Sequence, residues 1–285
     1  MISIIIPTYN RASLLSRTLN SIKSQTSSNW ECIVVDDSST DNTKEVVDGL
    51  VACDSRFSYL RNTHQKGAQG ARNTGLEHAK SEWVVFFDSD NIMHDNFVVV
   101  LSSKISRDFD VIACCSDIVD VATGRTGRVM NPNCHGIIHD RLFQMKCYVD
   151  FNQAIIRKEK LFEISELDEA CPSMQEWDTH IRLSKFSNYT MVEDSLVDYF
   201  QGGKDAISSN TKREVIGRLY ILRKHLDEWK KHQVGLTSFC YQIYNLICKN
   251  DDAVFVEEKT KELRSLVPFC DLRLSLMKIW HKIRY

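Results

Sequence analysis

The first 37 residues contain apolar residues with two different periods. Residues 3–6, Ser-Ile-Ile-Ile, and residues 32–35, Cys-Ile-Val-Val, are short β-branched runs that read as buried strands. Between them, leucine, threonine and isoleucine recur every three to four residues, which is the spacing of a helix with one buried face. A strand, a helix and a second strand in this order form a βαβ unit with parallel strands. The chain therefore predicts an α/β fold with a parallel sheet.

Polar residues follow three of the predicted strands directly. Thr8-Tyr9-Asn10 comes after the first strand, Asp36-Asp37 after the second, and Asp88-Ser89-Asp90 after a strand predicted over residues 83–87. We expect Pro7 and the aspartates to end these strands. In open parallel sheets, ligands bind beyond the carboxyl ends of the strands. We therefore expect the three polar segments to form one site.

The composition fits a compact globular protein. A chain of 285 residues with 43% hydrophobic side chains can bury one large core and a modest appendage. The sequence starts without a basic leader, and no apolar run approaches the roughly 18 residues of a membrane-spanning helix, so we expect a cytoplasmic protein. Ten cysteines occur without a Cys-x-x-Cys pair, so we expect reduced, mostly buried thiols.

The second half of the chain changes in character. We expect a strand near residues 111–115, a helix over residues 173–186, a loop at residues 199–203 and helices from residue 211 onward. Residues 211–285 contain 15 Lys and Arg against 9 Asp and Glu, whereas the whole chain has a net charge of −2. A basic tail on an acidic body suggests an anionic partner surface, either phospholipid or nucleic acid.

The pair Asp88 and Asp90 is the candidate metal site. Two hard carboxylate oxygens at a strand end, where alternation points them the same way, suit Mg²⁺ or Mn²⁺ bound to a diphosphate. The sequence Asp108-Phe109-Asp110 has the same spacing, but it precedes a strand, so we interpret it as a solvated turn. Asp36 and Asp37 either cap the following helix or accept hydrogen bonds from uracil and ribose, with Tyr9 stacked on the base.

Two further segments contain candidate site residues. Residues 67–73, Gly-Ala-Gln-Gly-Ala-Arg-Asn, lack both known phosphate-loop patterns, so Arg72 either reaches a ligand or makes a surface ion pair at a helix start. In residues 175–178, Gln-Glu-Trp-Asp, a carboxylate beside a tryptophan is a candidate general base. The alternative is an ordinary amphipathic helix in which Asp178 pairs with Arg182.

Five motifs in order resemble glycosyltransferase family 2. They are Ile-Pro-Thr-Tyr-Asn-Arg (6–11), Val-Val-Asp-Asp-Ser-Ser (34–39), Gly-Ala-Arg-Asn-Thr-Gly (70–75), Phe-Phe-Asp-Ser-Asp (86–90) and Gln-Glu-Trp-Asp-x-x-x-Arg (175–182). The resemblance covers residues 1–210 and implies a GT-A fold, with a Rossmann-like nucleotide-sugar-binding half (1–110) joined to an acceptor half (111–210). Residues 211–285 are then a basic helical extension.

The resemblance also implies an activity and roles for individual residues. It implies an inverting transfer of a hexose or N-acetylhexosamine from a UDP-sugar to a saccharide hydroxyl on a lipid-linked acceptor, in surface polysaccharide or O-antigen biosynthesis. Asp90 would hold Mn²⁺ or Mg²⁺ with help from Asp88, and Glu176 would be the general base, with Asp178 as the second choice. The nucleotide-sugar would contact Pro7, Thr8, Tyr9, Arg11, Asp36, Asp37, Arg72, Asn73, Asp88 and Ser89.

This chain departs from the family pattern at two positions. The third aspartate that often follows the metal motif is Asn91, and the base position, often an aspartate, is Glu176. A glutamate is one methylene longer, so the acceptor hydroxyl would lie farther from the backbone.

The extension adds one more expectation. Leu272, Leu276, Ile279 and Ile283 share a helical face, which fits either a helix at the inner face of the cytoplasmic membrane or a terminal helix packed on the body.

Two other functions compete with this prediction. A sugar-nucleotide nucleotidyltransferase is the nearest enzymatic rival, but its glycine-rich loop is missing after the first strand. A catalytically silent nucleotide-binding or scaffold protein would be expected to lose Asp90 or the base, and both are present. Nucleic-acid binding is disfavoured by the acidic body and the lack of a recognised module.

Overall fold

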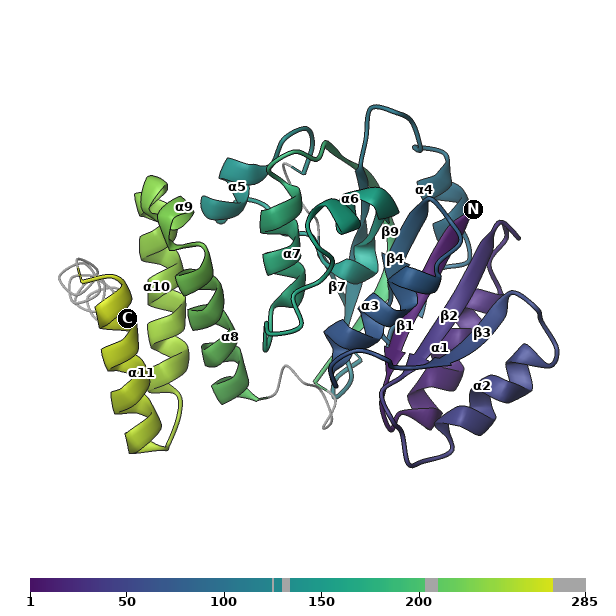
Figure 1. The fold of residues 1–285 in the computed structure, drawn as a ribbon, viewed down its shortest axis with the longest axis horizontal. Coiled ribbons are helices and arrows are strands. Elements are labelled where there is room, and N and C mark those ends of the chain that lie inside the picture. The colour runs from purple at the N-terminus through teal and green to yellow at the C-terminus, as the bar shows by residue number, and fades with distance from the viewer. Residues whose placement is uncertain (125, 130–133, 203–209, 269–285) are drawn as a thin grey trace.

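The computed structural model describes residues 1–124, 126–129, 134–202 and 210–268, which form one sheet covered by helices and a helical segment at one side (Figure 1). The described strands are β1 (Ile2–Thr8), β2 (Trp30–Asp36), β3 (Phe57–Arg61), β4 (Trp83–Phe86), β5 (Ile92–Met93), β6 (Val111–Asp120), β7 (Thr126–Val129), β8 (Ala154–Arg157) and β9 (Tyr189–Gln201). The helices are α1 (Ala12–Lys23), α2 (Thr43–Val51), α3 (Ala68–His78), α4 (Phe97–Ser102), α5 (His139–Phe143), η1 (Phe151–Gln153), α6 (Lys158–Glu163), α7 (Gln175–Leu183), α8 (Thr211–Lys224), α9 (Leu226–Lys231), α10 (Gln233–Cys248) and α11 (Ala253–Leu266).

The N-terminal strands are parallel, as the βαβ pattern predicts. β1 lies between β2 and β4, and β3 pairs with the other edge of β2, all in parallel register. The sheet continues in the order β3-β2-β1-β4-β8-β6-β9-β5, with β7 paired to β6, and its longest ladders, β1 with β2 and β6 with β9, are parallel. The predicted α/β, GT-A-like fold class is therefore confirmed. The sheet passes residue 110 without a break, so the two predicted halves share it.

Side chains of β1 alternate between two cores. Ile2, Ile4 and Ile6 pack in one apolar cluster, whereas Ile5 lies in a second cluster on the opposite face. Successive side chains of a strand point to opposite faces, so both faces of this sheet need a cover. Helices α1, α2 and α4 contribute to the first cluster, and α3, α5, α6, α7 and the helical segment contribute to the second.

Helix α3 lies close to the sheet because Gly75 has no side chain. A Cβ atom at Gly75 would lie 2.4 Å from Cγ2 of Ile5 and 3.2 Å from Cγ2 of Val35. We expect Gly75→Ala to lower the free energy of unfolding by about 1–3 kcal/mol, the usual cost of overpacking a core. In α2, Gly49→Ala is the control, since nothing lies within 4 Å of its Cβ. Urea unfolding compares the two, and a Gly75→Ala protein as stable as wild type would contradict the close approach.

Helices α8 to α11 form a bundle beside the α/β part, drawn in green to yellow in Figure 1. The rings of Trp229 and Phe239 stack with their centroids 4.5 Å apart, and Trp177 of α7 lies 5.2 Å from Phe239. The helical prediction is therefore confirmed for the described residues after 210, apart from short connections. The face formed by Leu272, Leu276, Ile279 and Ile283 lies outside the described residues.

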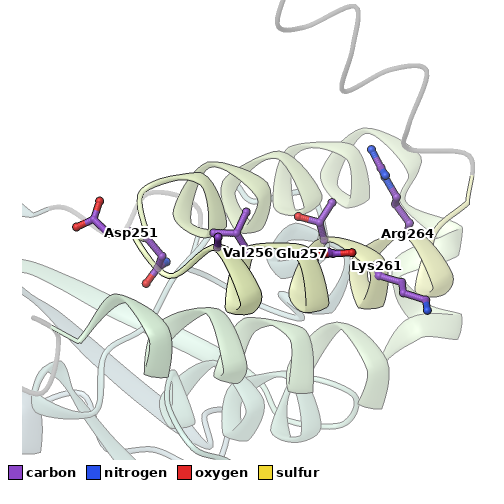
Figure 2. Close-up of a pocket in the computed structure, with 8 residues that line it drawn as sticks. Asp251, Val256, Glu257, Lys261 and Arg264 are labelled. Carbon is purple, nitrogen blue, oxygen red and sulfur yellow. The ribbon is translucent and has the colours of Figure 1, made fainter.

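The outer side of this bundle has a surface hollow (Figure 2). Its lining consists of residues from α11 and the connection before it: Asn250, Asp251, Ala253, Val256, Glu257, Thr260, Lys261 and Arg264. None of the site residues predicted from sequence lines it. In the described part of the chain, every helix is either too short or too polar to cross a bilayer.

Two backbone predictions differ from the structure. The predicted loop at residues 199–203 is wrong for residues 199–201, which end β9 and pair with β6, while Gly203 lies outside the described residues. Aromatic side chains favour a strand when a neighbouring strand is available, and here that pairing outweighs the glycine signal. Strand β1 also continues through Pro7 to Thr8 instead of stopping at the proline.

The expectation of reduced thiols is wrong for one pair. Cys134 and Cys147 form a disulfide with their Cα atoms 6.0 Å apart. Because the pair is 13 residues apart in sequence, a search for close cysteine spacing does not detect it. Seven other cysteines are free in the described residues, and five of these are buried, as expected: Cys32, Cys114, Cys115, Cys171 and Cys240.

Candidate active site

The three polar segments at the carboxyl ends of β1, β2 and β4 contact one another. The backbone N–H of Asp37 donates to the carbonyl of Thr8 at 2.9 Å, which joins the ends of β1 and β2. Arg11, which follows β1, donates to the carboxylate of Asp90, which follows β4. The convergence that parallel topology predicts is therefore present.

Asp36 holds the turn after β2. Its Oδ1 accepts from the backbone N–H of Ser39 at 2.9 Å, and its Oδ2 accepts from the Tyr59 hydroxyl at 2.7 Å. Burial and this bond to Asp36 raise the pKa of Tyr59 to about 12, so the phenol stays a donor. Both Asp36 oxygens thus have partners within the fold.

Asp37 links the end of β2 to the loop before α3. Its carboxylate accepts from Nδ2 of Asn62 at 2.7 Å and from the backbone N–H of Gly67 at 2.9 Å. The N-cap residue of α2 is Asn42, so neither aspartate caps that helix. The capping alternative is therefore wrong for both residues.

The residues that end β1 differ in accessibility. Pro7 and Thr8 are buried, and Oγ1 of Thr8 has no hydrogen-bond partner among the described residues. The ring of Tyr9 is 45% exposed, with Nζ of Lys66 at 5.1 Å from its centroid. Tyr9 is therefore free to stack on a ligand, as the sequence prediction requires.

Arg72 of α3 forms a partly buried ion pair instead of the surface pair of the alternative interpretation. Its side chain is 8% exposed, and Nη2 donates to Oδ1 of Asp88 at 2.8 Å. Nη1 donates to Oε1 of Gln69 at 2.8 Å and to Oε1 of Gln175 at 3.1 Å. One guanidinium group therefore joins the turn after β4 to the first residue of α7.

Asn73 and Ser89 are also buried near these elements. Nδ2 of Asn73 donates to the carbonyl of Leu167 at 2.9 Å and to Oε1 of Glu169 at 2.8 Å. Asn73 therefore anchors the loop before α7. Ser89 lies in that turn, between the two candidate metal ligands.

Asp88 and Asp90 lie in a turn, because β4 ends at Phe86. Strand alternation is therefore not what brings the two carboxylates together, contrary to the sequence argument. Burial and the negative charge of Asp88 raise the pKa of Asp90 above its usual value, even though Arg11 lowers it. Two carboxylates that repel each other favour a bound cation, and hard oxygen ligands fit Mg²⁺ or Mn²⁺.

Asn91, which replaces a frequent aspartate of the family, has a structural role. Its side chain is 1% exposed, and Oδ1 accepts from the backbone N–H of Phe200 at 3.1 Å. Its carbonyl accepts from the Thr18 hydroxyl at 2.8 Å. The turn that carries Asp88 and Asp90 is thus fixed to β9 and α1.

Glu176 lies in the first turn of α7, beside the Asp88 turn. It accepts a hydrogen bond from the Tyr148 hydroxyl at 2.5 Å. Met174, the N-cap residue of α7, has left-handed backbone angles of φ 55° and ψ 40°, so the chain turns sharply into the helix. Gln175 holds this start of α7 to Arg72.

Asp178 points to the opposite side of α7, toward the helical bundle. It is fully buried and accepts from Nε of Arg182 at 2.9 Å and from Nε2 of His225 at 2.8 Å, with Nζ of Lys224 at 2.8 Å. Burial alone would raise its pKa, but the His225 hydrogen bond and the charges of Arg182 and Lys224 lower it well below the usual range. The pairing with Arg182 confirms the amphipathic-helix alternative for this residue.

Trp177 also faces the bundle. Its side chain is 5% exposed and packs against Phe239 and Trp229. Its ring also contacts that of Tyr148, with the centroids 6.1 Å apart, and Tyr148 donates to Glu176. Trp177 therefore joins α7 to α10 and also lies next to the hydrogen-bond partner of Glu176.

A second acidic residue, Asp150, belongs to the same group as Glu176 and was not predicted from the sequence. Asp150 precedes η1, and its Oδ1 accepts from the backbone N–H of Asn152 at 2.8 Å and from Nδ2 of Asn152 at 2.7 Å. Asn152 also bonds Asp88 twice, with Nδ2 donating to Oδ2 at 2.9 Å and Oδ1 accepting the backbone N–H at 2.7 Å. Burial and the charges of Glu176 and Asp88 raise the pKa of Asp150 to about 7.

Tyr199 of β9 belongs to the same group of side chains. Burial and the charges of Asp150, Asp88 and Glu176 raise its pKa above the usual value. Because Asp150 and Tyr199 match no spaced motif, no sequence signal identifies them as site residues.

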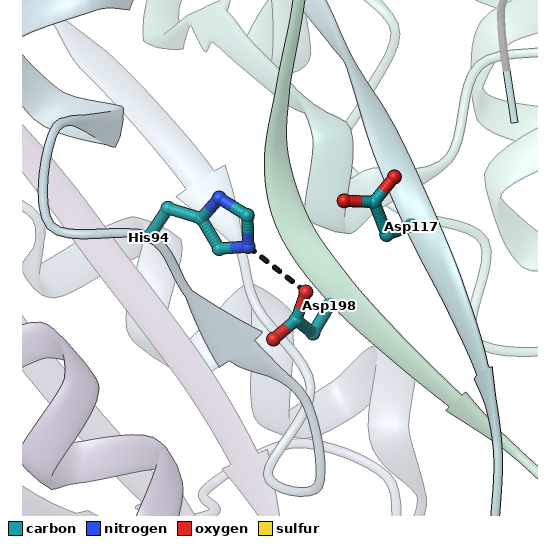
Figure 3. Close-up of side chains that lie close together, drawn as sticks. All are labelled: His94, Asp117 and Asp198. Carbon is teal, nitrogen blue, oxygen red and sulfur yellow. Dashed lines mark hydrogen bonds and ion pairs between the residues drawn. The ribbon is translucent and has the colours of Figure 1, made fainter. Parts of the chain in front are cut away.

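A different group of potential metal ligands consists of His94, which follows β5, Asp117 of β6 and Asp198 of β9 (Figure 3). Nε2 of His94 lies 2.9 Å from Oδ1 of Asp198, and Asp117 completes a set whose ligand atoms all lie within 4.8 Å of one another. In β-sheet register, Asp117 is paired with Asp198 on one side and with Arg128 on the other. The contact between His94 and Asp198 therefore links the end of β5 to β9, with Asp117 beside it on β6.

The family model described as Glycosyl transferase family 2 matches residues 3–164, more than half of the chain. The chain belongs to glycosyltransferase family 2. A relative from Escherichia coli is 46% identical over 92 residues, which is 32% of this chain and 36% of the relative. It is named UDP-Glc:alpha-D-GlcNAc-diphosphoundecaprenol beta-1,3-glucosyltransferase WfgD. The chain thus spans about a third of the length of this family 2 relative.

Solved structures confirm the fold. The S. aureus TarS fragment 1–349 in complex with UDP-GlcNAc has a TM-score of 0.62 and 18% identity, over 93% of this chain and 71% of that one. The mannosyltransferase PcManGT from Pyrobaculum calidifontis, in complex with GDP-Man and Mn²⁺, has a TM-score of 0.65 and 16% identity, over 99% of this chain and 79% of that one. At these identities the likeness supports the GT-A architecture of this family 2 member.

Proposed function

We propose that this protein transfers a hexose or N-acetylhexosamine from a UDP-sugar to a hydroxyl of a lipid-linked saccharide, with inversion at the anomeric carbon. The observation that carries the proposal is the Arg72 guanidinium, which binds Asp88 and Gln175 together. This places the turn that contains Asp88, where the diphosphate would bind, next to the start of α7, where Glu176 would act as the base. Family membership supplies the reaction class.

The donor would bind at the ends of β1 and β2. The exposed ring of Tyr9 stacks on the base, Asp37 accepts from the uracil imide, and Pro7, Thr8 and Asp36 shape the floor. Arg11 and Arg72, which pair with Asp90 and Asp88, would contact the diphosphate, and Asn73 and Ser89 would line the same part of the site.

Asp90 and Asp88 would hold Mn²⁺ or Mg²⁺. The metal, when bound, neutralises the negative charge of the departing nucleoside diphosphate. Because Asp90 is bonded to Arg11 in the structure, Arg11 would leave that carboxylate and turn to the diphosphate. The mannosyltransferase relative of known structure was solved with Mn²⁺.

Glu176 would accept the proton of the attacking hydroxyl. The acceptor oxygen forms a bond to the anomeric carbon while the bond from that carbon to the diphosphate oxygen breaks on the opposite face, and the proton passes to Glu176. The Tyr148 hydroxyl, bonded to Glu176 at 2.5 Å, orients the carboxylate. Asp178, the second choice, is occupied by its buried ion pairs.

The proposal for the acceptor is supported by the named relative and by the positive charge of the C-terminal extension. The WfgD relative is named for a diphosphoundecaprenol acceptor, so we propose a lipid-linked saccharide and a role in surface polysaccharide or O-antigen biosynthesis. Residues 1–110 would bind the nucleotide-sugar and residues 111–210 the acceptor. The basic extension, residues 211–285, would hold the cytoplasmic protein at the inner face of the membrane.

A screen of nucleotide sugars, with and without Mn²⁺, tests the proposal. We expect nucleoside diphosphate release from a UDP-sugar and transfer to a synthetic lipid diphosphate that carries one N-acetylglucosamine. Chelation with EDTA should lower transfer by at least about 100-fold, and added Mn²⁺ or Mg²⁺ should restore it.

The other outcomes of the screen favour the rival functions. Release of pyrophosphate from UTP and a sugar phosphate would indicate a nucleotidyltransferase. Binding of UDP without release of nucleoside diphosphate from any donor would indicate a catalytically silent member of the family.

A further inference from the structure

The second carboxyl group beside the candidate base has no role in the mechanism above. Asp150 is linked to Asp88 through the side chain of Asn152, and the charges of Glu176 and Asp88 both act on it. Its Oδ1 is used twice by Asn152, whereas Oδ2 makes no hydrogen bond within the part of the chain that the structure describes. The residue therefore has one fixed oxygen and one available oxygen.

Helix capping does not account for an acid at this position. Asp150 is the N-cap residue of η1, but asparagine or serine caps a helix about as well as aspartate. An aspartate here must tolerate burial and repulsion from two other carboxylates, which a neutral cap avoids. The unfavourable burial and repulsion indicate that the carboxyl group of Asp150 has a function other than capping.

The position of Asp150 is fixed relative to the donor side. Asn152 makes two hydrogen bonds to Asp150 and two to Asp88, so the two acids are held as one unit. On the other side, Tyr148, two residues earlier in the chain, donates to Glu176. Asp150 is thus joined through Asn152 to the group that would face the diphosphate, and it follows by two residues the tyrosine that is bonded to the group that would deprotonate the acceptor.

The chemistry around Asp150 selects a class of acceptor. Carboxyl oxygens and the phenol groups of Tyr148 and Tyr199 bind sugar hydroxyls, and their rings offer apolar faces to a pyranose. A carboxylate on the acceptor at this place would add a like charge to the group formed by Asp88, Asp90, Asp150 and Glu176. Such repulsion is a common means of rejecting a wrong substrate.

We propose that Asp150 is an acceptor-specificity residue, which binds a hydroxyl next to the attacking one on an uncharged sugar and rejects a uronic acid there. The inference rests on the proposed function, since it requires that Glu176 face an acceptor sugar. Asp150 would accept a hydrogen bond when ionised and donate one when protonated, so a hydroxyl partner suits both forms.

The test compares two acceptors and two variants. The acceptors are a synthetic lipid diphosphate with one N-acetylglucosamine and the same molecule oxidised to a carboxylate at C6. In Asp150→Asn, which keeps the cap, we expect the KM for the neutral acceptor to rise about 10- to 100-fold, the value of a hydrogen bond to a charged group. UDP binding and donor hydrolysis without acceptor should stay close to wild type, and the preference for the neutral acceptor over the oxidised one should fall.

A matched control separates specificity from folding. Asp252→Asn removes the charge of another N-cap aspartate, in α11, and should leave both acceptor KM values unchanged. Asp150→Ser keeps a cap hydrogen bond and should behave as Asp150→Asn does. An unchanged acceptor KM and preference, or a loss of UDP binding equal to the loss of transfer, would overturn the inference. If wild type transfers to neither acceptor and releases no nucleoside diphosphate, the proposed function itself fails.

Discussion

Replacing Glu176 by glutamine is expected to reduce sugar transfer by about 10²- to 10⁴-fold, the usual contribution of a general base. The amide keeps the size of the side chain and accepts the hydrogen bond from Tyr148, so the start of α7 should retain its structure. The amide nitrogen cannot take the acceptor proton, so the loss should fall on kcat. UDP binding should change little, because the proposed donor contacts lie on β1, β2, α3 and the Asp88 turn. Transfer assays and UDP titration measure the two effects.

A matched substitution on a neighbouring helix controls for the loss of a negative charge. Glu163 is exposed at the end of α6 and pairs with Lys160 at 2.9 Å. Glu163→Gln should therefore leave transfer unchanged. Near-normal transfer by Glu176→Gln would contradict the assignment of the base, whatever the control does.

The part of the candidate site that depends on local pattern and parallel topology was predictable from sequence. Apolar runs followed by polar residues identify strand ends, and parallel strands bring those ends to one edge of the sheet. The contacts between Asp37 and Thr8 and between Arg11 and Asp90 follow from this rule. The fold class and the helices after residue 210 were also predictable, because strands and helices have different periods of apolar residues.

The part that depends on contacts between distant segments was not predictable. Asp150 and Asn152 lie more than 60 residues after Asp88 in the sequence, and the segment around them has no periodic pattern or spaced motif. The disulfide between Cys134 and Cys147 is hidden for the same reason. Trp177 shows a further limit. The sequence does not show what its ring contacts, because the contact with Phe239 depends on how α10 packs against α7.

A second large effect is expected on stability, from Asp178 on the side of α7 opposite to Glu176. Residues two apart on a helix point about 200° apart, so Glu176 faces the candidate site and Asp178 faces the bundle. Asp178→Ala should lower the free energy of unfolding by about 3–5 kcal/mol, because it leaves Arg182, Lys224 and His225 without their shared buried partner. The loss should loosen α8 and α9 from α7, which urea unfolding and protease sensitivity both report.

The same ion pairs fix the pH dependence of that loss. The pKa of Asp178 is lower in the folded protein than its unfolded value of about 3.9, so its contribution is full above pH 4 and falls as pH decreases toward the folded pKa. The stability difference between wild type and Asp178→Ala should therefore shrink as the pH falls below about 4. Asp48→Ala removes an exposed i,i+4 pair with Lys44 and should cost under about 1 kcal/mol at every pH. An equally small cost for Asp178→Ala would mean that the buried network does not hold the bundle to α7.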